Sequence, residues 1–335
     1  MGFRYRFRGK MYKLDLKDRK ILYELDINCR QSNAQIGKKV GLKRDVVAYR
    51  IKRLQEEGVI SNFYAELDTF RLGYNVFRIY INFQYVTSDV KEEIIQYFVN
   101  NPNSWVVYSE KSEFDLGIVM WVKDIYDFYN FWDKTLDKYE NYFADHDLSI
   151  YIKAIVYKKS FLLDDEKAEP DRELFRLHCG GNSIEIDEVD YKLINELAGN
   201  ARAPLIELAE KLKISSQTVN YRIKNLLKNE IIKAFRVGIN YSKLGLQKFK
   251  IEIYLKDHKS KNKIIEYLAT KPYHDFMNLA IGRADLEPEL VVKNLDELLK
   301  IMDEINNQFS GAVKKQSFLI GENFYKFRCL PELNF

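Results

Sequence analysis

The sequence predicts an α+β protein in which one chain carries the same two-part unit twice, and three observations lead to this prediction. The segment 15–73 realigns without a gap onto 187–245, with 172 added to every residue number. In the first part of each copy, apolar residues recur at helical spacing. In the second part, β-prone and helical stretches alternate in the same order in both copies. A repeat this long is a whole domain or domain pair, so we expect a dimer-like arrangement within one chain.

Composition and charge set the limits for this fold. The 335 residues suffice for two to four domains, and 46% apolar with 30% charged residues is a globular balance. No apolar run approaches the roughly 18 residues that cross a bilayer. The three cysteines are sparse and odd in number, which favours a reducing compartment, and we expect the cytoplasm. Because the net charge is only +4, the distribution of charge has to indicate any nucleic-acid partner.

The first part of each copy predicts three short helices followed by a β-prone stretch. Their apolar positions are Ile21, Leu22, Leu25, Ile36, Val40, Val47, Ile51 and Leu54, matched by Leu193, Ile194, Leu197, Leu208, Leu212, Val219, Ile223 and Leu226. A tight turn that includes Gly41 joins the second and third helices, and residues 60–67 have the pattern of a strand. We therefore expect winged helix-turn-helix domains at 12–68 and 184–240.

The second part of each copy has the order β-α-β-β-α-β. In the first copy the strands are expected at 76–86, 105–110, 114–122 and 148–158, and the helices at 90–100 and 125–143. In the second copy the six elements are expected at 249–255, 263–270, 275–281, 286–292, 295–309 and 313–320. This is the ferredoxin-like order, predicted for domains at 74–161 and 246–325. The segment 162–183, with an acidic run and Gly180-Gly181, has the composition of a linker. Because an open sheet needs its apolar face covered, we expect the two sheets to pack against each other.

Both copies share an ordered set of motifs. The first contains Leu14-Asp15-x-x-Asp18-x-Lys20-Ile21-Leu22, Asn28-x-Arg30, Val47-x-Tyr49-Arg50-Ile51-x-x-Leu54, Gly58-Val59-Ile60 and Leu72-Gly73. The second contains Ile186-Asp187-x-x-Asp190-x-Lys192-Leu193-Ile194, Asn200-x-Arg202, Val219-x-Tyr221-Arg222-Ile223-x-x-Leu226, Ile231-Ile232 and Leu244-Gly245. These residues resemble the Lrp/AsnC family of leucine-responsive, or feast/famine, transcriptional regulators. The chain departs from the family in two respects. Members usually carry one domain pair per chain, whereas this chain has two, and the first copy lacks the glycine of a motif found in many effector domains.

The resemblance implies a sequence-specific regulator that binds double-stranded DNA. In the family a winged helix-turn-helix domain binds DNA, and the ferredoxin-like domain dimerises and binds small molecules. A homo-oligomer of pseudo-dimeric chains is therefore expected, with an amino-acid-like effector as a possible ligand. We expect no cofactor, since the sequence has neither a phosphate-binding glycine loop nor a dinucleotide fingerprint. No Cys/His spacing matches a zinc site, so no metal is expected.

The third helix of each copy is the expected recognition helix. Placing Val47 at the centre of the buried face turns a polar set outward. The residues expected at bases or in the groove are Arg44, Ala48, Tyr49, Lys52, Ser216, Gln217, Asn220 and Tyr221, and those expected at phosphates are Lys43, Arg53, Lys224 and Lys228. Gln and Asn suit adenine, whereas Arg and Lys suit guanine. The alternative is a solvated polar face, and the domain context favours DNA over it.

Three further expectations concern charged residues near these helices. Arg50 and Arg222 fall at the core edge, where Asp18 and Asp190 could pair with them, so a structural role is favoured over DNA contact. Ser215 can cap its helix and Lys43 at the matched position cannot, so the two DNA-reading heads differ chemically. If both bind, we expect an imperfect palindrome; the alternative is that the two halves do different jobs. The N-terminal Arg4, Arg6, Arg8 and Lys10 could contact phosphates or form a solubilising tail.

An effector site is implied by the resemblance alone. Many family members carry Gly-x-x-Asp between the second and third strands of the effector domain. The second copy keeps it as Gly282-Arg283-Ala284-Asp285, whereas the first copy has Ser112-Glu113-Phe114-Asp115, without the glycine. The expected effector residues are therefore Gly282, Asp285 and, with less support, Asp115.

Two other functions remain open. Sirohaem decarboxylases of haem biosynthesis share this two-domain architecture and typically carry His-Asn-Tyr-x-Arg-like and Tyr-Asn-x-Trp-Phe-like stretches. The corresponding segments here, 105–110, 114–119, 276–280 and 286–290, do not supply that His/Arg arrangement, so we expect no enzyme. The other alternative is an architectural DNA-binding or interaction protein that has lost sequence specificity.

Overall fold

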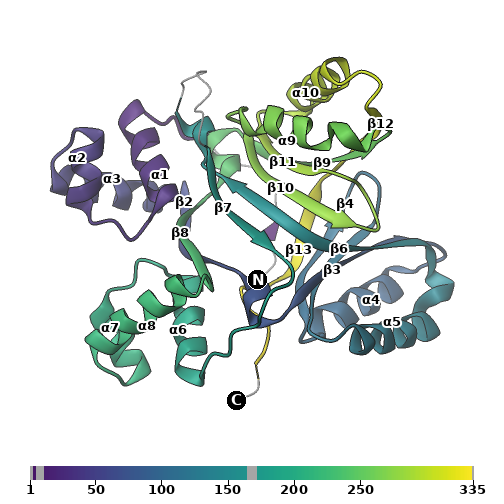
Figure 1. Ribbon diagram of the computed structural model, residues 1–335, viewed down its shortest axis with the longest axis horizontal. Coiled ribbons are helices and arrows are strands. Elements are labelled where there is room, and N and C mark those ends of the chain that lie inside the picture. Colours follow the sequence, from purple (N-terminus) through teal and green to yellow (C-terminus); the bar gives the residue numbers. More distant parts are fainter. Residues whose placement is uncertain (1–2, 5–10, 164–171, 334–335) are drawn as a thin grey trace.

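The computed structural model describes residues 3–4, 11–163 and 172–333 and contains both copies of the expected three-helix unit, here called the first and second heads. Residues 6, 8 and 10 of the basic N-terminal segment lie outside the described range. The first head consists of α1 (Leu16–Ile27), α2 (Asn33–Val40), α3 (Arg44–Glu56) and β2 (Ile60–Leu67). The second consists of α6 (Glu188–Gly199), α7 (Leu205–Leu212), α8 (Ser216–Lys228) and β8 (Ile232–Ile239). Figure 1 shows the two heads on the same side of the molecule, joined where β2 and β8 meet.

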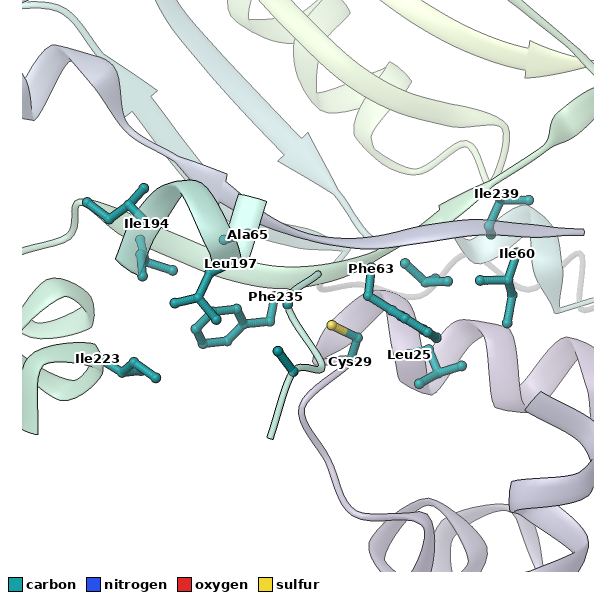
Figure 2. Packing of buried hydrophobic residues seen from close by; sticks show 14 of the residues in the cluster. Leu25, Cys29, Ile60, Phe63, Ala65, Ile194, Leu197, Ile223, Phe235 and Ile239 are labelled. Carbon is teal, nitrogen blue, oxygen red and sulfur yellow. The ribbon is translucent and has the colours of Figure 1, made fainter. Parts of the chain in front are cut away.

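The expected wings differ from the prediction, because β2 and β8 pair with each other. The two strands form an antiparallel two-stranded sheet in which Phe63 lies opposite Val237 and Ala65 opposite Phe235. A single strand needs hydrogen-bond partners for its backbone, and the matching strand of the other copy provides them. Figure 2 shows Phe63 over Leu25 of the first head and Phe235 beside Leu197 of the second. The heads are therefore joined through one shared apolar core.

Two arginines reinforce this joint reciprocally. Arg30 Nη1 donates to the Ala201 carbonyl at 2.6 Å, and Arg202 Nη1 donates to the Cys29 carbonyl at 2.5 Å. The guanidinium of Arg30 lies over the ring of Phe235, and that of Arg202 over the ring of Phe63. Arg30 and Arg202 occupy the matched Asn-x-Arg motifs, so this shared motif holds the two heads together.

The ferredoxin-like elements follow the predicted order in both halves. The first half has β3 (Asn75–Phe83), α4 (Ser88–Asn100), β4 (Ser104–Glu110), β5 (Leu116–Val122), α5 (Ile125–Tyr139) and β6 (Phe143–Tyr157). The second has β9 (Gln247–Leu255), α9 (Lys261–Ala269), β10 (His274–Ile281), β11 (Glu287–Val292), α10 (Leu295–Gln308) and β12 (Val313–Leu319). In Figure 1 the α4/α5 pair and the α9/α10 pair cover opposite outer faces of the sheet. Each helix pair closes its own apolar core.

The strands of both halves form one continuous sheet, which has 11 strands among the described residues. β6 joins the halves, because it pairs with β3 (Ile79 opposite Leu148) and with β10 (Met277 opposite Ile155). In the second half, β13 (Gly321–Phe327) follows β12 and crosses back to pair with β4. β6 and the β12–β13 run are thus matched crossovers between the two halves.

Three further strands complete this sheet. Part of the segment expected to be a linker is a strand, β7 (Glu173–His178), which pairs with β6. The sequence analysis did not anticipate β13, whose partner strand lies in the other half. The short β1 (Phe3–Arg4) pairs with β13 and places the backbone of Arg4 beside the sheet.

Charged side chains from both halves meet between the two parts of the sheet. Lys250 Nζ on β9 donates to the Tyr80 hydroxyl on β3 at 3.1 Å, although β6, β10 and β11 separate these strands in the sheet order. The sheet therefore curls so that its inner faces pack against each other, as expected. In this interior the fully buried Glu287 accepts from Arg78 Nη2 at 2.5 Å and lies 2.7 Å from Lys250 Nζ. Burial alone would raise the pKa of Glu287, but Arg78 and Lys250 hold it at about 2.

We expect Glu287→Gln to lower the free energy of unfolding by about 3–5 kcal/mol, because it leaves two buried cations without a counter-charge. Urea denaturation followed by circular dichroism measures the change. The control is Glu188→Gln, which removes an exposed ion pair with Lys192 and should cost less than about 1 kcal/mol. Equal losses in both variants would contradict a stabilising role for Glu287.

Candidate nucleic-acid interface

The recognition helices α3 and α8 are held by one face and exposed on the other. Val47, Ile51 and Leu54 are buried in α3, and Val219, Ile223 and Leu226 are buried in α8, as their spacing predicts. Tyr49 and Tyr221, at matched positions, are each 65% exposed. Both helices thus have a solvent-facing side that a large ligand can reach.

Most of the residues predicted to contact DNA lie on these exposed sides. In α3 the side chains of Lys43, Arg44, Tyr49 and Lys52 are exposed and Ala48 is half-buried. In α8 those of Gln217, Asn220, Tyr221, Lys224 and Lys228 are exposed and Ser216 is half-buried. The structure therefore brings each predicted set together on one surface, one set per head.

Arg53 has a different environment from its neighbours on α3. Its Nη2 donates to both carboxylate oxygens of Asp18, at 2.9 and 2.8 Å, and its side chain is 32% exposed. The buried carboxylate of Asp18 also accepts from Arg50 Nη1 at 2.7 Å. Arg53 thus combines an interior ion pair with a partly exposed position at the edge of the candidate surface.

The structural role expected for Arg50 and Arg222 is confirmed. Arg50 pairs with Asp15 as well as Asp18, and Arg222 pairs with the matched Asp187 and Asp190. The hydrogen bond that Arg50 donates to Asp15 is the largest cause that raises the pKa of Arg50, and the bond that Arg222 donates to Asp190 is the largest cause for Arg222. The same ion pairs thus occur in both copies, and in each head they hold the recognition helix against the first helix.

The start of the recognition helix differs between the heads. In α8 the Ser215 hydroxyl accepts from the Thr218 N–H at 3.1 Å, which caps the helix. In α3 the matched Lys43 makes no side-chain cap. The free N–H groups of this helix start carry partial positive charge beside two exposed cations, Lys43 and Arg44.

The sequence analysis missed one pair of exposed residues on the preceding helices. Lys38 on α2 and Glu210 on α7 occupy matched positions and are both exposed. The first helix of a helix-turn-helix crosses the DNA backbone, so charge there bears on phosphate binding. Helical spacing from the buried Ile36 and Val40 would have revealed Lys38 as outward-facing.

The residues expected to bind an effector have structural contacts. Asp285 Oδ2 accepts from the Leu255 N–H at 2.7 Å, and Asp115 Oδ2 accepts from the Phe83 N–H at 2.9 Å, so both carboxylates bind the ends of matched strands. Gly282 has φ +101°, and a Cβ there would lie 2.5 Å from the Leu148 carbonyl oxygen. The glycine therefore allows a close backbone approach to β6. In the part of the chain described, no group of three His, Cys, Asp or Glu residues is placed to hold a metal, and no helix could span a membrane.

Comparison with known proteins matches these features. An AsnC-type helix-turn-helix domain matches residues 14–55, and a winged helix-turn-helix DNA-binding domain matches residues 186–233. An uncharacterized HTH-type transcriptional regulator of Pyrococcus horikoshii is 33% identical over 130 residues, which is 38% of this chain and 87% of the relative. The HTH-type transcriptional regulator Ptr1 of Methanocaldococcus jannaschii is 32% identical over 112 residues, 33% of this chain and 74% of the relative.

The protein is therefore a helix-turn-helix protein of the transcription-regulator class. More specifically, the chain belongs to the Lrp/AsnC family of transcriptional regulators, as the sequence predicted. Among solved structures, the sirohaem decarboxylase NirDL covers 93% of this chain with a TM-score of 0.62 at 14% identity. At that identity the likeness, which also covers 92% of that protein's chain, shows the fold alone.

We expect Arg53→Ala to lower the free energy of unfolding by about 1.5 kcal/mol, because it removes a charged hydrogen-bond pair from buried Asp18. The matched variant Asn225→Ala, for which the structure gives no such ion pair with Asp190, should change it by less than about 0.5 kcal/mol. Thermal and urea unfolding of both variants measure the difference. If the two variants lose equal stability, the interior role of Arg53 is refuted.

Proposed function

We propose that this protein is a sequence-specific regulator that binds double-stranded DNA through α3 and α8 together. The observation that supports this most is the joint between the heads: β2 pairs with β8, so two exposed recognition helices sit on one unit. Two reading heads held on one unit are the arrangement with which dimeric helix-turn-helix proteins contact two half-sites of one duplex.

The proposed contacts follow from the side chains on each helix. Arg44 and Lys52 would bind guanine edges, while Gln217 and Asn220 would bind adenine edges. Ala48, Tyr49, Ser216 and Tyr221 would lie along the groove. Phosphate contacts are assigned to Lys43, Lys224 and Lys228, with Arg53 contributing from the edge of the surface, where its side chain is partly exposed.

An amino-acid-like effector is a weaker part of this proposal. It rests on the family resemblance, and the surface that would hold it includes Gly282, Asp285 and the matched Asp115. Since one oxygen of Asp285 binds the strand end, its other oxygen, 3.8 Å from His258 Nδ1, is the group left for a ligand amine. We also propose that the protein acts in the cytoplasm, where a regulator meets DNA, and that these chains associate further.

The decarboxylase alternative has the whole-chain fold likeness in its favour and the local chemistry against it. A tetrapyrrole with many carboxylates needs several free cations around its site. At the junction of the heads with the second ferredoxin-like half, Lys159 and Arg236 are buried and both are paired with Asp26. His274 is buried there too, and burial lowers its pKa to about 3, so it stays neutral at ordinary pH. The regulator assignment is therefore favoured.

We expect binding of random-sequence duplex DNA to weaken steeply as salt rises, because bound phosphates release counterions. Fluorescence anisotropy over a salt series gives the slope of log Kobs against log salt. Lys43→Ala and Lys224→Ala, which remove proposed phosphate contacts, should each reduce that slope by about 1. Lys134→Ala, an exposed lysine on α5 away from both heads, is the control and should leave it unchanged. Folded protein that binds no DNA at low salt would falsify the proposal.

Two titrations separate the small-molecule possibilities. Calorimetry with the individual amino acids should give heat for at least one of them, and Asp285→Asn should remove that heat. Absorbance titration with an iron-uroporphyrin III analogue, the ligand in a NirDL co-complex structure, should give no shift of the Soret band. Silence across all amino acids would remove the effector from the proposal, and a saturable Soret shift would favour the enzyme alternative.

A further inference from the structure

We infer that the two heads have different tasks, so that the chain binds a non-palindromic duplex site in one fixed orientation. The first head grips phosphates and a guanine-containing half-site, and the second reads an adenine-containing half-site. This inference rests on the proposed function and specifies the DNA that the same surface takes.

The outward charge differs at five matched positions around the start of the recognition helix. The pairs, first head then second, are Lys38 and Glu210, Gly41 and Lys213, Lys43 and Ser215, Arg44 and Ser216, and Asp45 and Gln217. The first head thus has three cations and one carboxylate where the second has one cation and one carboxylate. Since phosphate binding depends on the number of cations that reach the backbone, the first head has the larger electrostatic share of affinity.

The helix starts strengthen this difference. Ser215 uses its hydroxyl to satisfy an N–H of α8, which leaves Gln217 and Asn220 as exposed amide groups. In α3 no side chain caps the start, so Lys43 and the free N–H groups there favour an anion. Amides that bind adenine bidentately supply sequence discrimination without adding charge.

The joint between the heads fixes the orientation of the two recognition helices relative to each other. The β2–β8 pairing and the reciprocal bonds of Arg30 and Arg202 prevent the heads from turning independently. The surroundings of the joint are themselves unequal. Asp26 in the first head accepts from Lys159 Nζ at 2.6 Å and from Arg236 Nε at 3.0 Å, whereas the matched residue of the second head is Ala198. The two half-sites therefore have a fixed order along the DNA.

Selection of bound duplexes from a random library, followed by sequencing, tests the inference on the full chain. Wild-type protein should enrich a motif whose two halves differ, one containing guanine and the other adenine. A variant that gives the first head the residues of the second (Lys38→Glu, Lys43→Ser, Arg44→Ser, Asp45→Gln and Ala48→Asn) should enrich a palindrome of the adenine-containing half. Its salt slope should also fall by about 2, from the loss of Lys38 and Lys43 at phosphates.

The reciprocal variant guards against a change that only disturbs folding. It gives the second head the residues of the first (Glu210→Lys, Ser215→Lys, Ser216→Arg, Gln217→Asp and Asn220→Ala) and should enrich a palindrome of the guanine-containing half. A palindromic motif from the wild type would overturn this inference and leave DNA binding intact. An enriched pool without any motif would also overturn it, and would identify an architectural binder. If nothing is enriched, the proposed function fails with it.

Discussion

The arrangement of the two halves depends on the ion pairs that the buried carboxylate of Glu287 makes with Arg78 and Lys250. Arg78 and Lys250 occupy matched positions of the repeat, so the dimer-like packing brings two cations into the same interior. Glu287 neutralises both, and its counterpart in the first half is Gly117, where a Cβ would lie 2.4 Å from the ring of Tyr108. A pair of two first halves would bury two guanidinium groups with no carboxylate between them. The interior therefore favours the unlike pairing, which a single chain supplies by covalent connection.

This unlike pairing extends from the sheets to the heads through buried charges. Arg236 on β8 binds Asp26 on α1, and Asp275 at the start of β10 lies 3.2 Å from Lys248 on β9. Burial would raise the pKa of Asp275, but Lys248, Lys159 and Arg236 hold it well below its usual range, so the carboxylate stays charged. One head is thus attached through ion pairs, whereas the apolar Trp105 stands at the position matched to Asp275. Fused copies are free to diverge in this way, because each position occurs only once in the pseudo-dimer that one chain forms.

The sequence was sufficient for whatever depends on spacing within one element. The period of Val47, Ile51 and Leu54 gives the buried face of α3, and the same face turns Tyr49 and Lys52 outward. The sequence could not predict which distant segments pair. Nothing local in residues 60–67 distinguishes a wing strand from a strand that pairs with β8. In the same way, nothing in residues 173–178 indicates pairing with β6, and nothing in residues 321–327 indicates pairing with β4. Within the site, Arg53 shows what sequence reasoning could not predict. Its position on the outward face of the helix predicts a phosphate contact, and only the three-dimensional position of Asp18 reveals the ion pair. The need for glycine at position 282 also depends on the three-dimensional structure, because the backbone of Leu148 in the other half leaves no room for a Cβ there.

The distribution of free cations connects this architecture to function better than the fold does. Within the described ranges the fully buried cations are Arg78, Lys159, Arg172 and Arg236, and each already has its partners. Arg172, for example, donates to the carbonyls of Ala269 and His274, which fixes the strand β7 against the second half. On the heads, Lys38, Lys43, Arg44, Lys224 and Lys228 are exposed, and exposed lysines such as Lys134 lie on other elements too. An anionic ligand is attracted where cations are uncompensated, and a surface shared by two joined helical heads fits a long polyanion rather than a compact one.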